Sequence, residues 1–162
     1  MLNEQIAVLD QAVIEAAQKN EKARLLMTQP GVGPITSLAF VLTMGDVNRF
    51  PRGKQVASYL GLIPREYSSG GTQRLGSISK QGNRFMRMLL VEAAQVAVRI
   101  DPQMRNEYLH RCHRKAKGVA KVAAARKLAI RLYWMLKTNT SYPEVVRVES
   151  SSRVPLVVPQ VG

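Results

Sequence analysis

The chain has 162 residues, of which 46% are hydrophobic and only 6% aromatic, which suits one helical domain and disfavours an aromatic-cored β-sandwich. It contains no apolar run of about 18 residues that could span a membrane, and no secretory signal begins it. A single cysteine excludes an internal disulfide and fits the reducing cytoplasm. The net charge is +13, and residues 49–137 concentrate it, with 19 basic against 4 acidic side chains. Such a basic segment predicts a nucleic-acid partner.

Residues 1–27 predict a helix with a heptad pattern. Its a and d positions are Ile6, Leu9, Val13, Ala16, Asn20, Ala23 and Met27. An asparagine at an a position would help to fix the register of a coiled coil. A single amphipathic helix packed on the domain's own core explains the same stripe equally well. We expect a coiled-coil-like helix, through which the chain would form a homodimer or tetramer.

Two apolar stretches flank the sequence Pro-Gly-Val-Gly at residues 30–33, an arrangement that resembles a helix-hairpin-helix. Gly31 and Gly33 would allow a tight turn whose backbone amides no side chain obstructs. Those amides, at the N-terminus of the following helix, are suited to hold a phosphate oxygen. A plain turn between two helices is the alternative.

Further along the chain, residues 61–79 are too rich in glycine and serine for a helix, and they predict a loop or a short hairpin that turns on Gly70 and Gly71. The tail from Ser141 reads as extended or disordered, because it contains three prolines. The expected fold is mainly α, with a helix at 1–27, a nucleic-acid-binding domain at 28–140 and a flexible tail at 141–162. The remaining expected helices are Arg52–Leu60, Lys80–Ile100 with Ser79 as N-cap, Pro102–Lys117 and, after Gly118, Val119–Lys137.

The loop at 61–79 offers two hydroxyls, on Ser68 and Ser69, amid a group of basic side chains. A hydroxyl beside guanidinium groups could attack a phosphodiester, because the cations stabilise the charge that develops. A Ser-Ser-Gly-Gly sequence is nevertheless far more often a turn than a nucleophile. The basic side chains around this loop are Arg65, Arg74, Lys80, Arg84 and Arg87.

The stretch from Leu26 to about Leu90 resembles the C-terminal domain of bacterial insertion-sequence transposases of the IS-one-ten type, also called Piv/MooV-like or DEDD transposases. The order and spacing of many short elements carry this resemblance. They are Pro30-Gly31-Val32-Gly33-Pro34, Phe50, Tyr59-Leu60-Gly61-Leu62, Pro64, Ser69-Gly70-Gly71, Arg74-Leu75-Gly76, Ile78-Ser79-Lys80-Gln81-Gly82-Asn83 and Arg87-Met88-Leu89-Leu90.

The resemblance implies a recombinase that cuts and rejoins DNA through a serine nucleophile and a covalent phosphoserine link. It also implies a separate RuvC-like domain whose four acidic residues bind magnesium, in some members a guide (bridge) RNA, and assembly into dimers and tetramers. By motif position the nucleophile would be Ser69, with Ser68 as its nearest competitor. Charge and spacing suggest Arg74, Lys80 and Arg84 as phosphate contacts.

No proton acceptor is evident beside the serines, where Glu66 is the only acidic residue. No clustered set of four acids occurs in the chain, so we expect no catalytic magnesium site and no cofactor within it. The chain would then be an excised domain, a truncated gene product or a product of internal initiation, inactive on its own. A helix-hairpin-helix binding module without chemistry and a structural RNA-binding protein are the alternative interpretations.

The helices after the loop add three expectations. His110, Cys112 and His113 are too few to form a structural zinc site, which needs four ligands. Trp134 is expected in the core by its helical spacing. A basic run around Gly118 is expected to contact the backbone of DNA or guide RNA; it comprises Arg111, Arg114, Lys115, Lys117 and Lys121.

Overall fold

The computed structural model describes residues 1–63 and 83–153. These ranges form eight α-helices and one short 3₁₀ turn and contain no strand, so the expectation of a mainly α fold is confirmed. The elements are α1 (Leu2–Lys19), α2 (Glu21–Leu26), α3 (Pro34–Met44), η1 (Val47–Arg49), α4 (Gly53–Tyr59), α5 (Arg84–Ile100), α6 (Pro102–Arg114), α7 (Lys117–Thr138) and α8 (Tyr142–Arg153).

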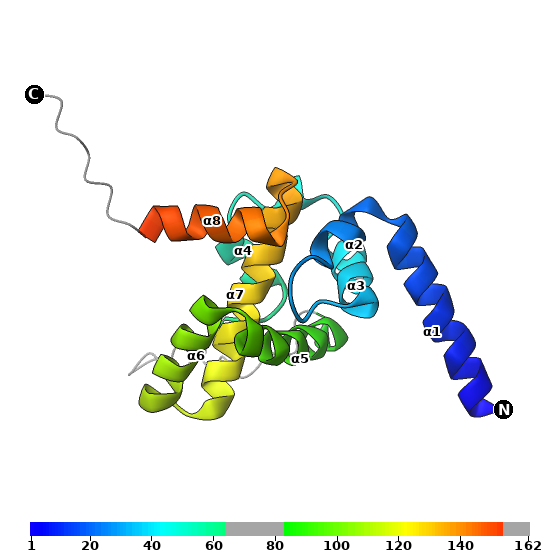
Figure 1. Ribbon diagram of the computed structural model, residues 1–162, viewed down its shortest axis with the longest axis horizontal. Coiled ribbons are helices and arrows are strands. Elements are labelled where there is room, and N and C mark those ends of the chain that lie inside the picture. The colour runs from blue at the N-terminus through cyan, green and yellow to red at the C-terminus, as the bar shows by residue number, and fades with distance from the viewer. Residues whose placement is uncertain (64–82, 154–162) are drawn as a thin grey trace, which may run out of the picture.

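Helix α7 is the centre of the domain, and Figure 1 shows it running through the molecule from the α6 end to α8. It contacts α2, α4, α5, α6, α8 and η1. Its buried side chains include Leu128, Leu132 and Tyr133, which join the core residues of α3 and α5. A helix that is apolar over so much of its surface is stable only when other helices surround it. Helices α2, α4, α5, α6 and α8 are therefore positioned around α7, and α3 packs on α1, α2 and α5.

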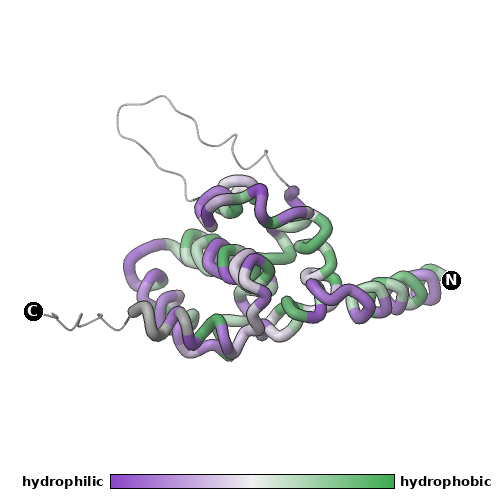
Figure 2. The backbone as a smooth tube through the Cα atoms, turned by 90° about the horizontal axis from the view of Figure 1, so that it is seen from above, coloured by the Kyte–Doolittle hydropathy of each residue, from purple (hydrophilic) through white to green (hydrophobic). Residues whose placement is uncertain are grey.

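Helix α1 projects from this body, with hydrophobic and hydrophilic residues along it (Figure 2). Residues 2–12 of this helix are exposed, and Ala17 is its buried residue. The prediction of one helix through residue 27 is wrong, because the helical conformation breaks at Asn20, where ψ is 114°. The Asn20 side chain instead caps α2 by accepting a hydrogen bond from the Ala23 amide at 3.0 Å. Pairing of α1 into a coiled coil remains a prediction.

Two further helix boundaries differ from the sequence expectation. Helix α5 begins at Arg84, and its N-cap is Asn83, whose side chain accepts from the Met86 amide at 3.1 Å. The predicted cap Ser79 and the predicted hairpin lie outside the described residues. Gly118 does not separate two helices; it lies in the first turn of α7, where a glycine costs little because the helix is only beginning.

The tail is helical through Arg153, which corrects the expectation of an extended tail from Ser141. Helix α7 ends at Asn139, whose left-handed conformation (φ 50°, ψ 47°) turns the chain toward α8. Pro143 lies in the first turn of α8, where proline is tolerated because its missing N–H has no helical partner. Val145 is buried in the core, and the Tyr142 amide donates to the Thr28 hydroxyl at 3.0 Å. The helix forms because it docks on the domain.

Candidate nucleic-acid interface

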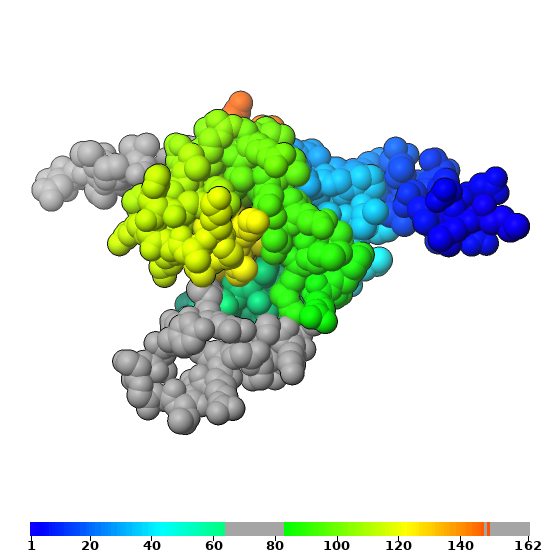
Figure 3. Space-filling view, turned by 90° about the horizontal axis from the view of Figure 1, so that it is seen from below, coloured from blue at the N-terminus to red at the C-terminus, as the bar shows by residue number. Residues whose placement is uncertain are grey.

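The turn between α6 and α7 carries exposed basic side chains. Arg114, Lys115 and Lys117 are exposed and Lys121 is half-buried. None of the four forms an ion pair with a residue of the described ranges. Helix α7 contains no acidic residue that could neutralise them. Figure 3 shows that α5, α6 and the start of α7 share one face of the molecule. The structure therefore confirms that this turn is an accessible cationic surface, and its contact with a nucleic acid remains a prediction.

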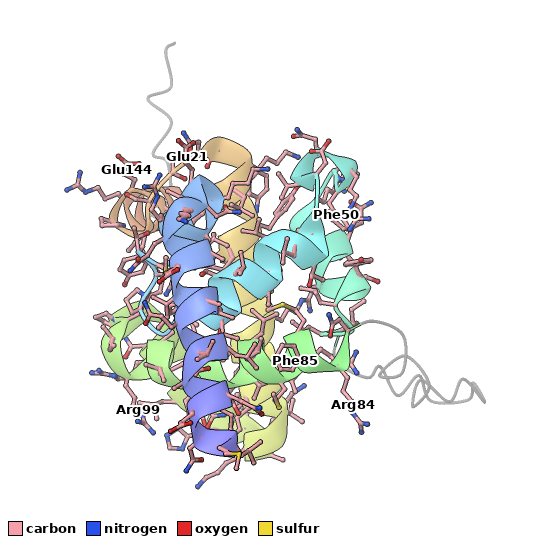
Figure 4. All side chains as sticks on the ribbon, turned by 90° about the vertical axis from the view of Figure 1, so that its right-hand side faces the viewer. Glu21, Phe50, Arg84, Phe85, Arg99 and Glu144 are labelled. Atoms are coloured by element: carbon pink, nitrogen blue, oxygen red, sulfur yellow. The ribbon has the colours of Figure 1, made fainter. Side chains whose placement is uncertain are left out.

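Arg84 and Arg87 lie in the first turns of α5, where Arg84 is exposed and projects away from the body (Figure 4). That turn contains no acidic residue. The N-terminus of a helix carries a partial positive charge, so cations there lower stability by about 0.3–1 kcal/mol each. The exposed Arg84 is thus electrostatically unfavourable at this position in the free protein. An anion bound beside it would remove the penalty.

Gly31 has a packing role that sequence reasoning missed. Its φ is +90°, and an added Cβ would lie 2.4 Å from the Ala93 carbonyl oxygen and 3.1 Å from the Ala97 backbone nitrogen of α5. The turn at 30–33 therefore lies against the backbone of α5, and only glycine fits. Gly33 is different, because nothing lies within 4 Å of an added Cβ there. Phosphate binding by the amides of this turn remains a prediction.

The two glycines form a matched pair for a stability measurement. Gly31→Ala should lower the free energy of unfolding by about 2 kcal/mol or more, because the left-handed backbone and the contact with α5 both oppose a side chain. Gly33→Ala should change it by less than about 0.5 kcal/mol, since its φ of −96° suits alanine. Urea unfolding followed by circular dichroism measures both. Equal stability of the two variants would contradict the packing role of Gly31.

Arg131 is not part of the basic surface, although sequence reasoning counted it there. Its side chain is fully buried and donates to Asp101 Oδ2 at 2.8 Å and to Glu149 Oε2 at 2.7 Å. The Tyr142 hydroxyl also donates to Asp101 Oδ2, at 3.1 Å. The sequence signal was available: Arg131 shares a helical face with Leu128 and Met135. This network joins the α5–α6 junction, α7 and α8.

The network keeps Asp101 ionised although its side chain is only 1% exposed. Burial opposes the charge, but the Met104 amide, Arg131 and the Tyr142 hydroxyl outweigh it and lower the pKa of Asp101 below the ordinary 3.8. Arg131 is buried too, yet Glu149 and Asp101 raise its pKa above the usual value. Arg131 is therefore charged and neutralised inside the protein.

The lowered pKa of Asp101 predicts acid sensitivity. Its ionised form is favoured by folding, so this stabilisation is complete above the unfolded value near 3.8 and is lost as the pH falls through the lower folded value. Asp101→Asn should be less stable at neutral pH and should lose less stability on acidification below about pH 4. Thermal melting against pH measures this. A wild-type and a variant curve that fall in parallel would contradict it.

Two other cations of the basic segment are also engaged within the fold. Lys127 pairs with Glu107 at 2.8 Å. Arg49 donates to the carbonyls of Met44 at 3.0 Å and Thr43 at 3.3 Å at the end of α3. Its guanidinium also lies 4.5 Å from the Phe50 ring centroid. The charge available to a polyanion is therefore smaller than the count from the sequence.

The remaining sequence predictions have mixed outcomes. Ser69, Ser68, Arg65, Arg74 and Lys80 lie outside the described residues. Trp134 is 39% exposed, so its assignment to the core is wrong, whereas its neighbour Tyr133 is fully buried. Within the described ranges no three His, Cys, Asp or Glu side chains cluster as metal ligands. The described helices also include none that is long and apolar enough to cross a membrane.

Residues 23–109 match the sequence model of the IS116/IS110/IS902 transposase family. The chain belongs to this transposase family. The matched segment includes the turn at 30–33, α5 and most of α6, whereas the basic α6–α7 turn and Arg131 follow it in the chain.

Several curated proteins match most of the chain. A probable family 20 transposase of Pseudomonas aeruginosa is 35% identical over 145 residues, which are 87% of this chain and 43% of that protein. The transposase for insertion sequence element IS1328 of Yersinia enterocolitica is 34% identical over 85% of this chain and 42% of its own length. The pilin gene-inverting protein of Moraxella bovis is 29% identical over 76% of this chain and 39% of its own length. The chain spans less than half the length of these relatives.

Proposed function

We propose that this chain is the DNA-contacting part of an IS110-type transposase and supplies Ser69 as the nucleophile for strand cleavage and rejoining. The family match over residues 23–109, which include Ser69, carries this proposal. Relatives named as transposases and as a pilin gene-inverting protein support a recombination role, because both kinds of name denote DNA rearrangement. The expected partner is DNA in the bacterial cytoplasm.

In the proposed reaction the Ser69 hydroxyl attacks a backbone phosphorus. An oxygen–phosphorus bond to serine forms, the bond between phosphorus and one sugar oxygen breaks, and that oxygen leaves as a hydroxyl after gaining a proton. A hydroxyl of another strand then attacks the phosphoserine and restores the serine. The covalent link conserves the energy of the broken ester, so rejoining needs no external energy source.

Arg84 and Arg87 support phosphate binding beside this serine. Both follow the proposed nucleophile in sequence, and the exposed Arg84 at the start of α5 is unfavourable until an anion binds. Guanidinium groups bind phosphate oxygens with paired hydrogen bonds and stabilise the additional charge of the transition state. The α6–α7 turn would add backbone contacts that hold the DNA without reading its sequence.

The family also implies magnesium and further partners. No group of three His, Cys, Asp or Glu side chains occurs among the described residues, and on the strength of the family resemblance we assign the magnesium ion to a separate RuvC-like domain. A guide RNA and assembly through α1 into a dimer or tetramer are part of the same proposal. The exposed apolar residues of α1, among them Leu2, Ile6 and Leu9, are compatible with pairing.

The proposal is tested by trapping the covalent intermediate. The full-length transposase that contains this chain is incubated with end-labelled donor DNA and then denatured with detergent. Labelled DNA should remain attached to the protein, and proteolysis should locate it on the peptide that contains Ser69. Strand exchange without such an adduct would overturn the phosphoserine mechanism and would favour a binding module without chemistry.

A further inference from the structure

We propose that Trp134 and the basic residues around it form a stacking site for an unpaired nucleotide of single-stranded DNA or RNA. The site lies on the C-terminal half of α7, where α4 begins. It is separate from the α6–α7 turn, which lies at the opposite end of α7. The inference goes beyond strand cleavage, and it rests on the proposed nucleic-acid partner.

The first observation is the exposure of the indole. Trp134 is the only tryptophan of the chain, and 39% of it is exposed, although it lies in the helix that forms the centre of the domain. Its ring is held at one edge by the buried Tyr133, with the two ring centroids 5.2 Å apart at an angle of 62°. Tyr133 is itself fixed, because its hydroxyl donates to the Phe50 carbonyl. The indole is therefore supported on one side and accessible on another.

The second observation is the charge around the indole. The Lys137 ammonium lies 5.6 Å from the Trp134 ring centroid and donates to the Phe50 carbonyl at 3.3 Å. The chain continues from Phe50 to Arg52 and Lys54, which are both exposed and form no ion pair with a residue of the described ranges. Neither α4 nor α7 contains an acidic residue.

The packing of α4 fixes these groups beside one another. An added Cβ on Gly53 would lie 2.7 Å from Ile130 Cγ2, so the start of α4 lies directly on α7 one turn before Trp134. Arg52 and Lys54 flank Gly53 in sequence, so their backbone lies near this contact and their exposed side chains add positive charge to this end of the domain. Helix α7 passes between α4 and α8 in Figure 4 and contacts both of them.

An exposed aromatic ring surrounded by cations matches the chemistry of an unpaired nucleotide. The base has an apolar face that stacks on the indole, and its phosphate is attracted by the lysines and the arginine. In a duplex the faces of the bases are stacked on one another, so a duplex would gain only the electrostatic attraction between its phosphates and the basic residues. An apolar protein partner would gain nothing from the absence of acidic residues in α4 and α7. The surface therefore favours single-stranded nucleic acid.

Because Trp134 is the only tryptophan, its fluorescence reports on this site alone. Oligo(dT) of about ten nucleotides, which spans one stacking site and its flanking phosphates, is titrated into the 162-residue chain. Saturable quenching should occur at lower concentration than with a blunt duplex of the same length. An oligo(U) arm compares RNA with DNA, and equal quenching by both supports recognition of an unpaired base.

Affinity measured by anisotropy of a labelled oligonucleotide gives the second readout. Trp134→Ala should weaken binding of oligo(dT) about fivefold to a hundredfold, and Trp134→Phe should retain most of the affinity. Leu42→Ala is the control, since Leu42 is 71% exposed on α3, a helix without basic residues, and its loss should affect binding by less than about twofold. The double variant Arg52→Ala/Lys54→Ala should reduce the salt dependence of binding.

Three outcomes would overturn the stacking site. They are an absence of quenching by oligo(dT), equal quenching by heparin, and an unchanged affinity of a folded Trp134→Ala variant. If the Trp134→Ala variant fails to fold, two measurements still test the stacking site. They are the fluorescence titration of the wild type and the salt dependence of binding by the Arg52→Ala/Lys54→Ala variant. Failure of these tests leaves the covalent adduct at Ser69 unaffected, so the two proposals are judged separately.

Discussion

Replacement of Ser69 by alanine in the full-length transposase should abolish strand exchange while DNA binding persists. Loss of a nucleophile typically lowers a catalysed rate by at least about 10³-fold. Affinity should stay within about twofold, because phosphate contacts made by basic side chains supply most of the binding energy. The measurement is strand exchange on a donor and a target DNA, with electrophoretic mobility shift as the binding assay.

Ser68→Ala is the matched control for this experiment. It removes a neighbouring hydroxyl of the same chemistry, and it should leave strand exchange within a few fold of wild type. If Ser68→Ala abolishes exchange and Ser69→Ala does not, the nucleophile is Ser68. If both variants remain active, neither serine is the nucleophile and the chain is better described as a binding module.

Removal of the buried guanidinium by Arg131→Ala should destabilise the domain by about 3–5 kcal/mol, because Asp101 loses its charged partner in the core. Asp101 is almost completely buried, and Glu149 would lose its partner as well. For a chain of this size the melting temperature should fall by about 6–20 °C. Thermal melting followed by circular dichroism measures the change.

Arg126→Ala provides the comparison within the same helix. Arg126 is half-buried in α7 and forms no ion pair with a residue of the described ranges, so its loss should cost less than about 1 kcal/mol. A melting temperature of Arg131→Ala equal to that of Arg126→Ala would contradict the structural importance of the network. Far-UV spectra should also show reduced helix content if α8 separates from α7 when Glu149 loses Arg131.

Local patterns in the sequence were sufficient for the helical class and for the approximate positions of α3 to α7. Apolar spacing and proline at helix starts act over a few residues, so they can be read without a fold. Local patterns predict the structure less well where one residue fits two different short-range signals. Asn20 satisfied a heptad position in the sequence, yet in the structure its carboxamide caps α2, because asparagine stabilises helix starts better than helix interiors.

Some features of the candidate site could likewise be predicted from local sequence patterns, and others could not. The charge density of the α6–α7 turn predicts its exposure, whereas no local pattern predicts that Gly31 packs against the α5 backbone. Trp134 was expected in the core because Val122, Ile130 and Leu136 share its helix, but α7 has an exposed side even at the centre of the domain. Exposure depends on which neighbouring helices pack at each position.

The sequence by itself determined the helical class, the basic character and the family of this transposase segment, since these depend on composition and on short motifs. Only the tertiary structure decided that the tail forms α8, that Arg131 is neutralised inside the protein and that Trp134 reaches the surface. The physical reason is the range of the interactions. Gln29, Asp101, Arg131 and Glu149 meet across more than one hundred positions of the chain, and no local pattern encodes such a contact.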